Sequence, residues 1–153
     1  MEHDYTFELK EFAKSLGAVL AAAADLELLK SLNTLPSNLL DNYRYSFSIA
    51  VVLPQTVIDS ITIKNPGEIY AHYYKTANLL LDQITFLLSE KITTYGYSAF
   101  AIPASSRYTQ DTFMAMASHK AFARAAGLGW IGKNALLITP QYGPRVRLAT
   151  VIT

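Results

Sequence analysis

The chain has 153 residues, of which 51% are hydrophobic and 16% charged, and its net charge is +1. This length and composition are typical of one globular domain with a buried core, and they exclude a disordered chain. The chain has no cysteine, which excludes disulfides, zinc–thiolate sites and cysteine-bound iron–sulfur clusters. We expect a single domain over residues 1–153. We also expect it in the cytoplasm, because no segment resembles a secretory signal or a membrane span.

The first part of the chain alternates helix and strand patterns. Apolar residues at helical spacing predict a helix over 5–16. The apolar run 18–25 favours a buried strand, although its many alanines leave a helix as the alternative. Residues 33–44 are expected to form a loop with one short helical turn. The β-branched and aromatic run 45–53 predicts a strand that ends at Pro54.

The strongest helix pattern follows a turn at 65–67. A continuous apolar stripe predicts a helix over 69–94 that ends near Gly96. A short strand over 97–103 and a polar loop over 105–112 are expected next.

The remaining residues predict a helix over 112–126, a glycine-rich turn over 127–134, and strands over 135–139 and 145–153. The last strand alternates apolar and basic residues with a period of two. We expect these two strands to form an antiparallel hairpin. The element order predicts an α/β fold of the α+β type, with a mixed sheet flanked by helices.

Charge is distributed unevenly along the chain. Residues 1–111 contain all 12 acidic residues and 8 basic ones, whereas 112–153 contain five basic residues and no acidic one. This asymmetry favours an anionic ligand or partner near the second segment. The alternative is that distant acidic residues fold back over these cations.

The motif GLGWIGKN, residues 127–134, combines three glycines with Trp130, Lys133 and Asn134. An exposed backbone, a flat apolar ring and a cation suit a large, flat, partly anionic cofactor. The motif follows a helix and precedes a strand, which is the reverse of the dinucleotide-binding context, and Lys133 is not followed by Ser or Thr as in a P-loop. The alternative is a helix cap and a tight turn.

The three histidines, His3, His72 and His119, do not have the spacing of metal ligands, so we expect no protein-built metal site. We expect His119 to be structural or exposed rather than a ligand. Tyr74, on the long helix, is expected to serve packing and to contribute little to ligand affinity.

Residues 118–153 resemble the segment before the ferredoxin clusters of epoxyqueuosine reductase-like iron–sulfur proteins. AGLGWIGKN (126–134) is the most recognisable part of this similarity. YGPR (142–145) and the strand after it resemble the corrinoid-dependent relatives, including the reductive dehalogenases. Weaker similarity to the same group lies in LKEFAKSLGA (9–18), IYAHYYKTANLLLDQITFLL (69–88) and GYSAFAIPAS (96–105).

The resemblance implies a cobalamin-binding domain with a nitroreductase-like fold, which in the family precedes a ferredoxin-like domain with two iron–sulfur clusters. Without cysteine this chain holds no such cluster, so we expect a truncated or stand-alone relative, incomplete as an enzyme by itself. The family's proton-donating aspartate aligns with Phe113, and Asp111 lies two residues away. We therefore transfer no catalytic role.

The resemblance also implies which residues bind the cofactor and which partners the chain has. Expected partners are a corrinoid and a separate iron–sulfur or other electron-donor protein, with tRNA and a second copy of the chain as further options. Alternatives to the corrinoid are a flavin, a non-catalytic interaction role or an RNA-binding remnant. The expected cofactor-binding residues are Lys120, Arg124, Trp130, Gly132, Lys133, Asn134, Tyr142 and Arg145.

Overall fold

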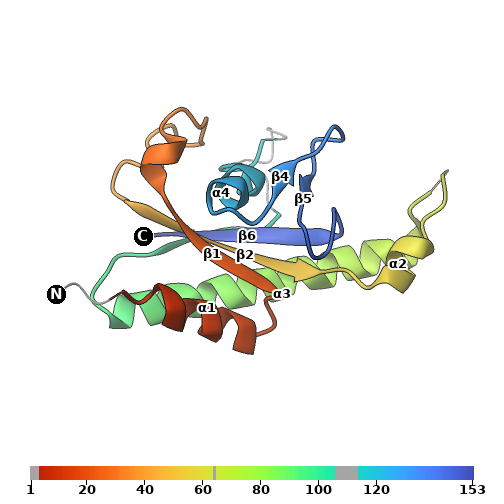
Figure 1. Cartoon of the computed structure of the whole chain (residues 1–153), viewed down its shortest axis with the longest axis horizontal. Helices are drawn as coiled ribbons and strands as arrows, with labels where there is room; N and C mark the ends of the chain where they lie inside the picture. The colour runs from red at the N-terminus through yellow and green to blue at the C-terminus, as the bar shows by residue number, and fades with distance from the viewer. Residues whose placement is uncertain (1–3, 64, 106–113) are drawn as a thin grey trace.

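A computed structural model describes residues 4–63, 65–105 and 114–153. A four-stranded sheet forms its middle layer, with α1 and α3 on one face and α4 with the β4–β5 pair on the other (Figure 1). In chain order the elements are α1 (Thr6–Ser15), β1 (Leu20–Asp25), the 3₁₀ helix η1 (Leu26–Leu29), β2 (Tyr45–Val52), α2 (Gln55–Asp59), α3 (Gly67–Thr94), β3 (Phe100–Ile102), α4 (His119–Ala125), β4 (Trp130–Ile131), β5 (Leu137–Ile138) and β6 (Val146–Ile152).

The strand order in the large sheet is β1-β2-β6-β3. All three of its strand pairs are antiparallel, with Phe47 opposite Val151 and Ile102 opposite Thr150. The predicted fold class, a sheet flanked by helices, is confirmed. The sheet is antiparallel in the described part of the chain, where we expected a mixed one.

The two central strands, β2 and β6, present alternate residues to the two helical layers. Phe47, Ile49 and Val51 face α1 and α3, together with Ala149 and Val151 of β6. The intervening residues face α4 and its surroundings, as Ala50, Leu148 and Ile152 show. The period of two read from the last strand is therefore confirmed, and it determines which side chains reach the α4 face.

The long helix α3 covers one face of the sheet with a single buried row. Leu81, Ile84, Leu88 and Ile92 are each at most 2% exposed. The helix predicted over 69–94 is confirmed, and so is the helix predicted over 5–16, which Gly17 ends with a φ of 114°. The strand predicted for 18–25 is confirmed, since β1 pairs with β2 over six residues.

The predicted hairpin between the last two strands is wrong. β5 pairs with β4, and β6 lies between β2 and β3 in the other sheet. The reason is the turn from Thr139 to Gly143, whose backbones exchange two hydrogen bonds of 3.0 and 2.9 Å. The chain then passes Pro144 and enters the large sheet. As a result, Leu137 packs over the face of β6, against Leu148, instead of beside it.

Two further elements differ from their predictions. α4 begins at His119 instead of residue 112, because the preceding segment bonds elsewhere: Met116 O accepts a hydrogen bond from Leu35 N at 2.8 Å. Residues 106–113, which contain most of the predicted polar loop, lie outside the described residues. The 3₁₀ helix at Leu26–Leu29 was not predicted, whereas the turn expected within 33–44 is present: Leu39 N donates to Pro36 O, and Tyr43 N donates to Leu40 O, both at 3.1 Å. Among the described residues, no helix is both long and apolar enough to cross a bilayer.

Candidate cofactor-binding site

A cavity of about 500 Å³ lies beside β6, where the neighbouring strand β3 stops. β3 pairs only with residues 150–152 of β6, so 146–149 have an edge that no described strand covers. We call this cavity the α4 cleft. Its lining includes His119 and Lys120 of α4, Leu136 and Leu137 of the β4–β5 pair, Arg147 and Leu148 of β6, and Asn33 and Ala104 from neighbouring loops.

The α4 cleft is cationic. Lys120 and Arg147 both line it, and none of its described lining residues is acidic. Two cations on partly apolar walls favour an anionic group, because the surrounding dielectric is lower than that of water. Two of the five basic residues of 112–153 therefore line a cavity, whereas Arg124 and Lys133 lie on the surface.

His119 fixes α4 to the sheet. Its Nε2 lies 2.9 Å from Pro103 O, and its Nδ1 lies 3.0 Å from Thr150 Oγ1. A carbonyl oxygen only accepts, so Nε2 carries the proton, and Nδ1 accepts from the threonine hydroxyl in the neutral ring. Burial lowers the pKa of His119, and the positive charge of Arg147 adds to this effect. The structural role expected for His119 agrees with these contacts.

The low pKa of His119 predicts a pH-dependent stability. The unfolded chain binds a proton near pH 6.5, whereas the folded protein resists it, so stability is complete above this pH and falls as the pH drops below it. The extra slope is at most about 1.4 kcal/mol per pH unit. Urea unfolding between pH 7.5 and 5 should show this slope in the wild type and in His72→Gln but not in His119→Gln. Equal slopes in all three proteins would contradict the assignment.

The β4–β5 pair, which we call the β4–β5 arm (residues 130–138), is attached to α4 by Lys120. Lys120 Nζ donates to Ala135 O at 2.6 Å. Ala135 has a φ of 60°, which is costly for a residue with a Cβ. Gly132 N donates to Leu136 O at 2.8 Å and closes the turn around it. Strained backbone of this kind collects at binding sites, where surrounding contacts maintain it.

The glycines of the motif serve the protein's own packing. A Cβ on Gly129 would lie 2.1 Å from Ile138 O, and one on Gly132 would lie 2.9 Å from Asn134 Oδ1 and Ile138 Cγ1. Gly132 does not have a positive φ, whereas Gly127 does, at 76°, after the end of α4. We expected Gly132 to need a positive φ or to leave space for a ligand. Its own chain fills that space.

Arg147 is the cleft residue that the sequence reasoning did not select. Its Nε and Nη2 donate to Asn78 Oδ1 at 3.3 and 3.2 Å, and its guanidinium lies 4.1 Å from the centre of the Tyr74 ring. The Tyr74 hydroxyl lies 3.2 Å from Ser105 Oγ; this hydrogen bond and then the charge of Arg147 lower the pKa of Tyr74. The sequence signal for Arg147 as a cation of the cleft was its position on an otherwise apolar strand.

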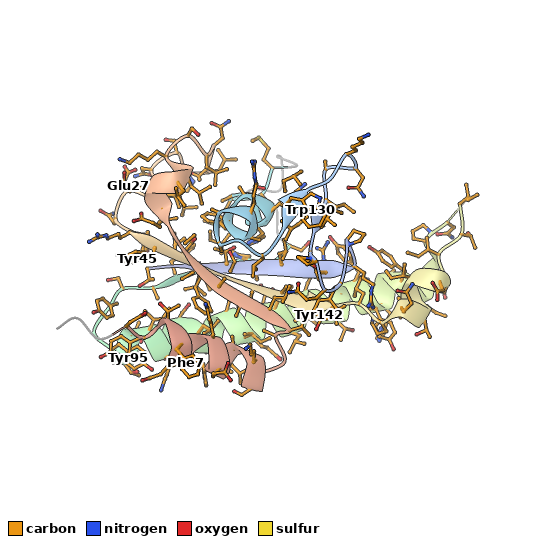
Figure 2. All side chains as sticks on the ribbon, viewed as in Figure 1. Phe7, Glu27, Tyr45, Tyr95, Trp130 and Tyr142 are labelled. Atoms are coloured by element: carbon orange, nitrogen blue, oxygen red, sulfur yellow. The ribbon has the colours of Figure 1, made fainter. Side chains whose placement is uncertain are left out.

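The structure separates the eight predicted residues into groups. Lys120 alone lines the α4 cleft. Trp130, Lys133 and Asn134 are exposed on the β4–β5 arm, and Arg124 is exposed on α4. Figure 2 shows Trp130 on the α4 side of the sheet and Tyr142 well apart from it.

The remaining pair, Tyr142 and Arg145, lies together. The Arg145 guanidinium is 6.0 Å from the Tyr142 ring centre, and its Nη1 donates to Leu53 O at 3.1 Å. These contacts attach the turn before β6 to the end of β2.

A second cavity, of about 640 Å³, lies at the other end of the sheet and contains none of the predicted residues. Tyr5, Tyr45 and Tyr95 line it, and the rings of Tyr5 and Tyr95 stack at 3.9 Å. Its lining includes Asp25 as well as Arg44, so it lacks the cationic character of the α4 cleft. An anionic ligand is therefore better matched by the α4 cleft.

Comparisons with known proteins point to one group of enzymes. No protein-family profile matches the chain. A stretch of 34 residues is 65% identical to the epoxyqueuosine reductase of Gloeobacter violaceus, and 36 residues are 58% identical to that of Listeria monocytogenes. These stretches cover 22% and 24% of this chain but only 11% and 10% of the relatives.

Solved structures share the fold over nearly the whole chain. Epoxyqueuosine reductase from Bacillus subtilis matches with a TM-score of 0.60 and 22% identity, over 95% of this chain and 44% of its own. A reductive dehalogenase, described as B12-dependent, matches with a TM-score of 0.65 and 18% identity, over 100% of this chain and 20% of its own. One epoxyqueuosine reductase structure contains a tRNA stem loop. The chain spans less than half the length of these proteins. Its short stretch of close sequence similarity confirms the expected resemblance to the epoxyqueuosine reductases, and it shares the fold of the reductive dehalogenases.

Proposed function

We propose that this chain binds a corrinoid at the α4 cleft and is the cofactor-binding part of an oxidoreductase. The observation that carries the proposal is the cationic cleft beside the glycine-rich β4–β5 arm. The fold supports it, because a B12-dependent dehalogenase shares this fold over the whole chain. The relatives are named as reductases and a reductive dehalogenase, which favours a redox role over a structural one.

The residues present fit part of a corrinoid. Cobalamin carries a phosphodiester and several amides, and the cleft offers Lys120 and Arg147 with no acidic residue among the described lining. Cavities for drug-sized ligands measure about 300–1000 Å³. A corrinoid is larger than such ligands, so a cavity of about 500 Å³ would enclose only one portion of it. The exposed ring of Trp130 offers an apolar face for the remainder.

Each residue has a role that follows from its contacts. Lys120 keeps two N–H donors beyond its bond to Ala135 O, and these would meet an anionic or amide oxygen. Arg147 is held by Asn78, so its charge is fixed at the cleft wall. His119 stays neutral and positions α4. When bound, the corrinoid supplies the redox chemistry of its cobalt, which no side chain here provides.

The proposal assigns no proton donor within the chain. Asp111 and Phe113, the two positions considered for the family's aspartate, lie outside the described residues. Because these 153 residues contain no cysteine, electrons would come from a donor outside them. tRNA is a proposed partner only through the relative that was solved with a stem loop.

Titration with aquacobalamin tests the binding. We expect a change in the visible spectrum and a higher Tm, because a ligand that binds only the folded state stabilises it. Lys120→Met keeps the aliphatic stem and should weaken binding by about tenfold to 150-fold, as expected for a charge-assisted hydrogen bond. Lys133→Met should weaken it less, because Lys133 lies on the exposed part of the β4–β5 arm.

The matched control is Lys30→Met, since Lys30 is exposed at the end of η1 and is not part of the cleft. It should bind like the wild type. An unchanged spectrum at millimolar cobalamin, or equal losses in Lys30→Met and Lys120→Met, would refute the proposal. Tighter binding of a flavin mononucleotide than of cobalamin would favour the flavin alternative instead.

A further inference from the structure

Among the described residues, α3 exposes five large apolar or aromatic side chains, of which Leu79 and Phe86 are the most exposed; the others are Ile69, Tyr73 and Leu87. Leu79 and Phe86 are 64% and 62% exposed. They are seven residues apart, so they lie on one stripe of the helix, opposite the buried row that includes Leu81, Ile84 and Leu88. Isolated apolar residues on a surface are common, but an aligned pair two turns apart on one long helix resembles an interface.

Charged residues extend this stripe symmetrically. Lys75 lies one turn before Leu79, and Glu90 lies one turn after Phe86. The order Lys75, Leu79, Phe86, Glu90 is symmetric about a point between residues 82 and 83. The apolar residues lie about 5 Å from that point along the helix and the charged ones about 11 Å. Each half has one large apolar residue and one charged residue, and the charges of the two halves are opposite.

This pattern is complementary to itself. If a second α3 lies antiparallel on the first, with a two-fold axis through the midpoint, Leu79 meets the partner's Phe86 and Lys75 meets the partner's Glu90. Both contacts occur twice, as in any isologous interface. A parallel arrangement in register would instead bring like charges together. A shallow crossing angle of about 20° keeps all four contacts within reach.

We propose that this face, which we call the α3 stripe (Lys75, Leu79, Phe86 and Glu90), binds a second copy of the chain as an antiparallel two-fold dimer. Asp82, next to the proposed axis, accepts a hydrogen bond from Ala104 N at 2.8 Å, which holds its carboxylate toward its own subunit. A partner with uniform charge would match only one end of the stripe, whereas a second copy matches both.

The dimer is independent of the corrinoid proposal. α3 covers the sheet face opposite the one that carries α4 (Figure 1), and no residue of the α3 stripe belongs to the described lining of the α4 cleft. Loss of the dimer and loss of cobalamin binding can therefore be measured separately.

Sedimentation equilibrium of the 153-residue chain over a range of concentrations tests the proposal. We expect a monomer–dimer equilibrium that Leu79→Ser and Phe86→Ser each weaken by at least about tenfold, because each substitution removes two contacts per dimer. Lys75→Glu and Glu90→Lys should each weaken it by about tenfold, since attraction becomes repulsion at both ends. The double variant with both reversals restores opposite charges and should return to within about threefold of the wild type.

Leu28→Ser is the control, because Leu28 is 68% exposed but belongs to η1, on the α4 side of the sheet. It should dimerise like the wild type. All four altered side chains on α3 are exposed, so circular dichroism should show an unchanged fold. A monomer at every concentration, a dimer insensitive to Leu79→Ser, or a double reversal that fails to restore association would overturn the proposal.

Discussion

Gly129→Ala is expected to lower the Tm by about 6–12 °C, which corresponds to about 3 kcal/mol in a domain of this size. The added Cβ would lie 2.1 Å from Ile138 O and 2.9 Å from Ile138 C, and both are backbone atoms. The clash can be removed only if the turn after α4 moves away from β5, because no side-chain rotation displaces these backbone atoms. Thermal unfolding followed by circular dichroism measures the effect.

Gly132→Ala is the matched control within the same motif. Its Cβ would meet only side-chain atoms, Asn134 Oδ1 and Ile138 Cγ1, at 2.9 Å. Because these side-chain atoms can move, the expected loss in the free energy of unfolding is about 1 kcal/mol, or 2–4 °C in Tm. If Gly132→Ala destabilises as much as Gly129→Ala, the packing of the β4–β5 arm against α4 is not as described here.

These glycines show what the sequence could and could not predict. The high density of glycine predicted that the backbone of this motif lies very close to other atoms, and Gly129 does lie close to the Ile138 backbone. It could not identify what is approached, because Gly129 and Ile138 come together only when the arm folds back on itself. The expectation of a ligand at Gly132 therefore assigned to a cofactor a space that the chain fills.

The main elements were predictable because each carries its own periodicity. α3 has a stripe with a period of 3.6, and β2 and β6 have alternating faces, so their positions and orientations follow from local pattern. The pairing of β6 did not follow, since strands adjacent in sequence usually pair. Its place between β2 and β3 depends on long-range contacts and on the turn from Thr139 to Gly143.

The sequence indicated a basic segment but, apart from Lys120, not the residues that line the α4 cleft. The excess of basic residues over 112–153 predicted a cationic region, and Lys120 lines the α4 cleft. Arg147 escaped selection because its partners, Tyr74 and Asn78, come from α3, about 70 residues earlier in the chain. Tyr74 was expected to serve packing, and it also stacks on Arg147, a cation of the cleft.

Arg147→Met is the second substitution for which we expect a large effect. It leaves the buried Asn78 side chain without its two N–H partners and removes a cation from the face of Tyr74. Together these two losses should lower the free energy of unfolding by about 3 kcal/mol, which corresponds to a Tm lower by 6–12 °C. Arg145→Met, two residues earlier, gives up one hydrogen bond to Leu53 O and should cost about 1 kcal/mol.

A double-mutant cycle separates the two roles of Arg147. Tyr74→Leu combined with Arg147→Met should show a coupling of about 1 kcal/mol in urea unfolding, because the guanidinium lies 4.1 Å from the ring centre. Arg147→Lys retains the positive charge but loses the planar group that stacks on Tyr74. Compared with Arg147→Met, it should therefore restore more of the cobalamin affinity than of the stability. If Arg147→Lys instead recovers stability and not affinity, the cleft recognises the shape of the guanidinium rather than its charge. Additive losses in the cycle would show that the stacked geometry contributes nothing.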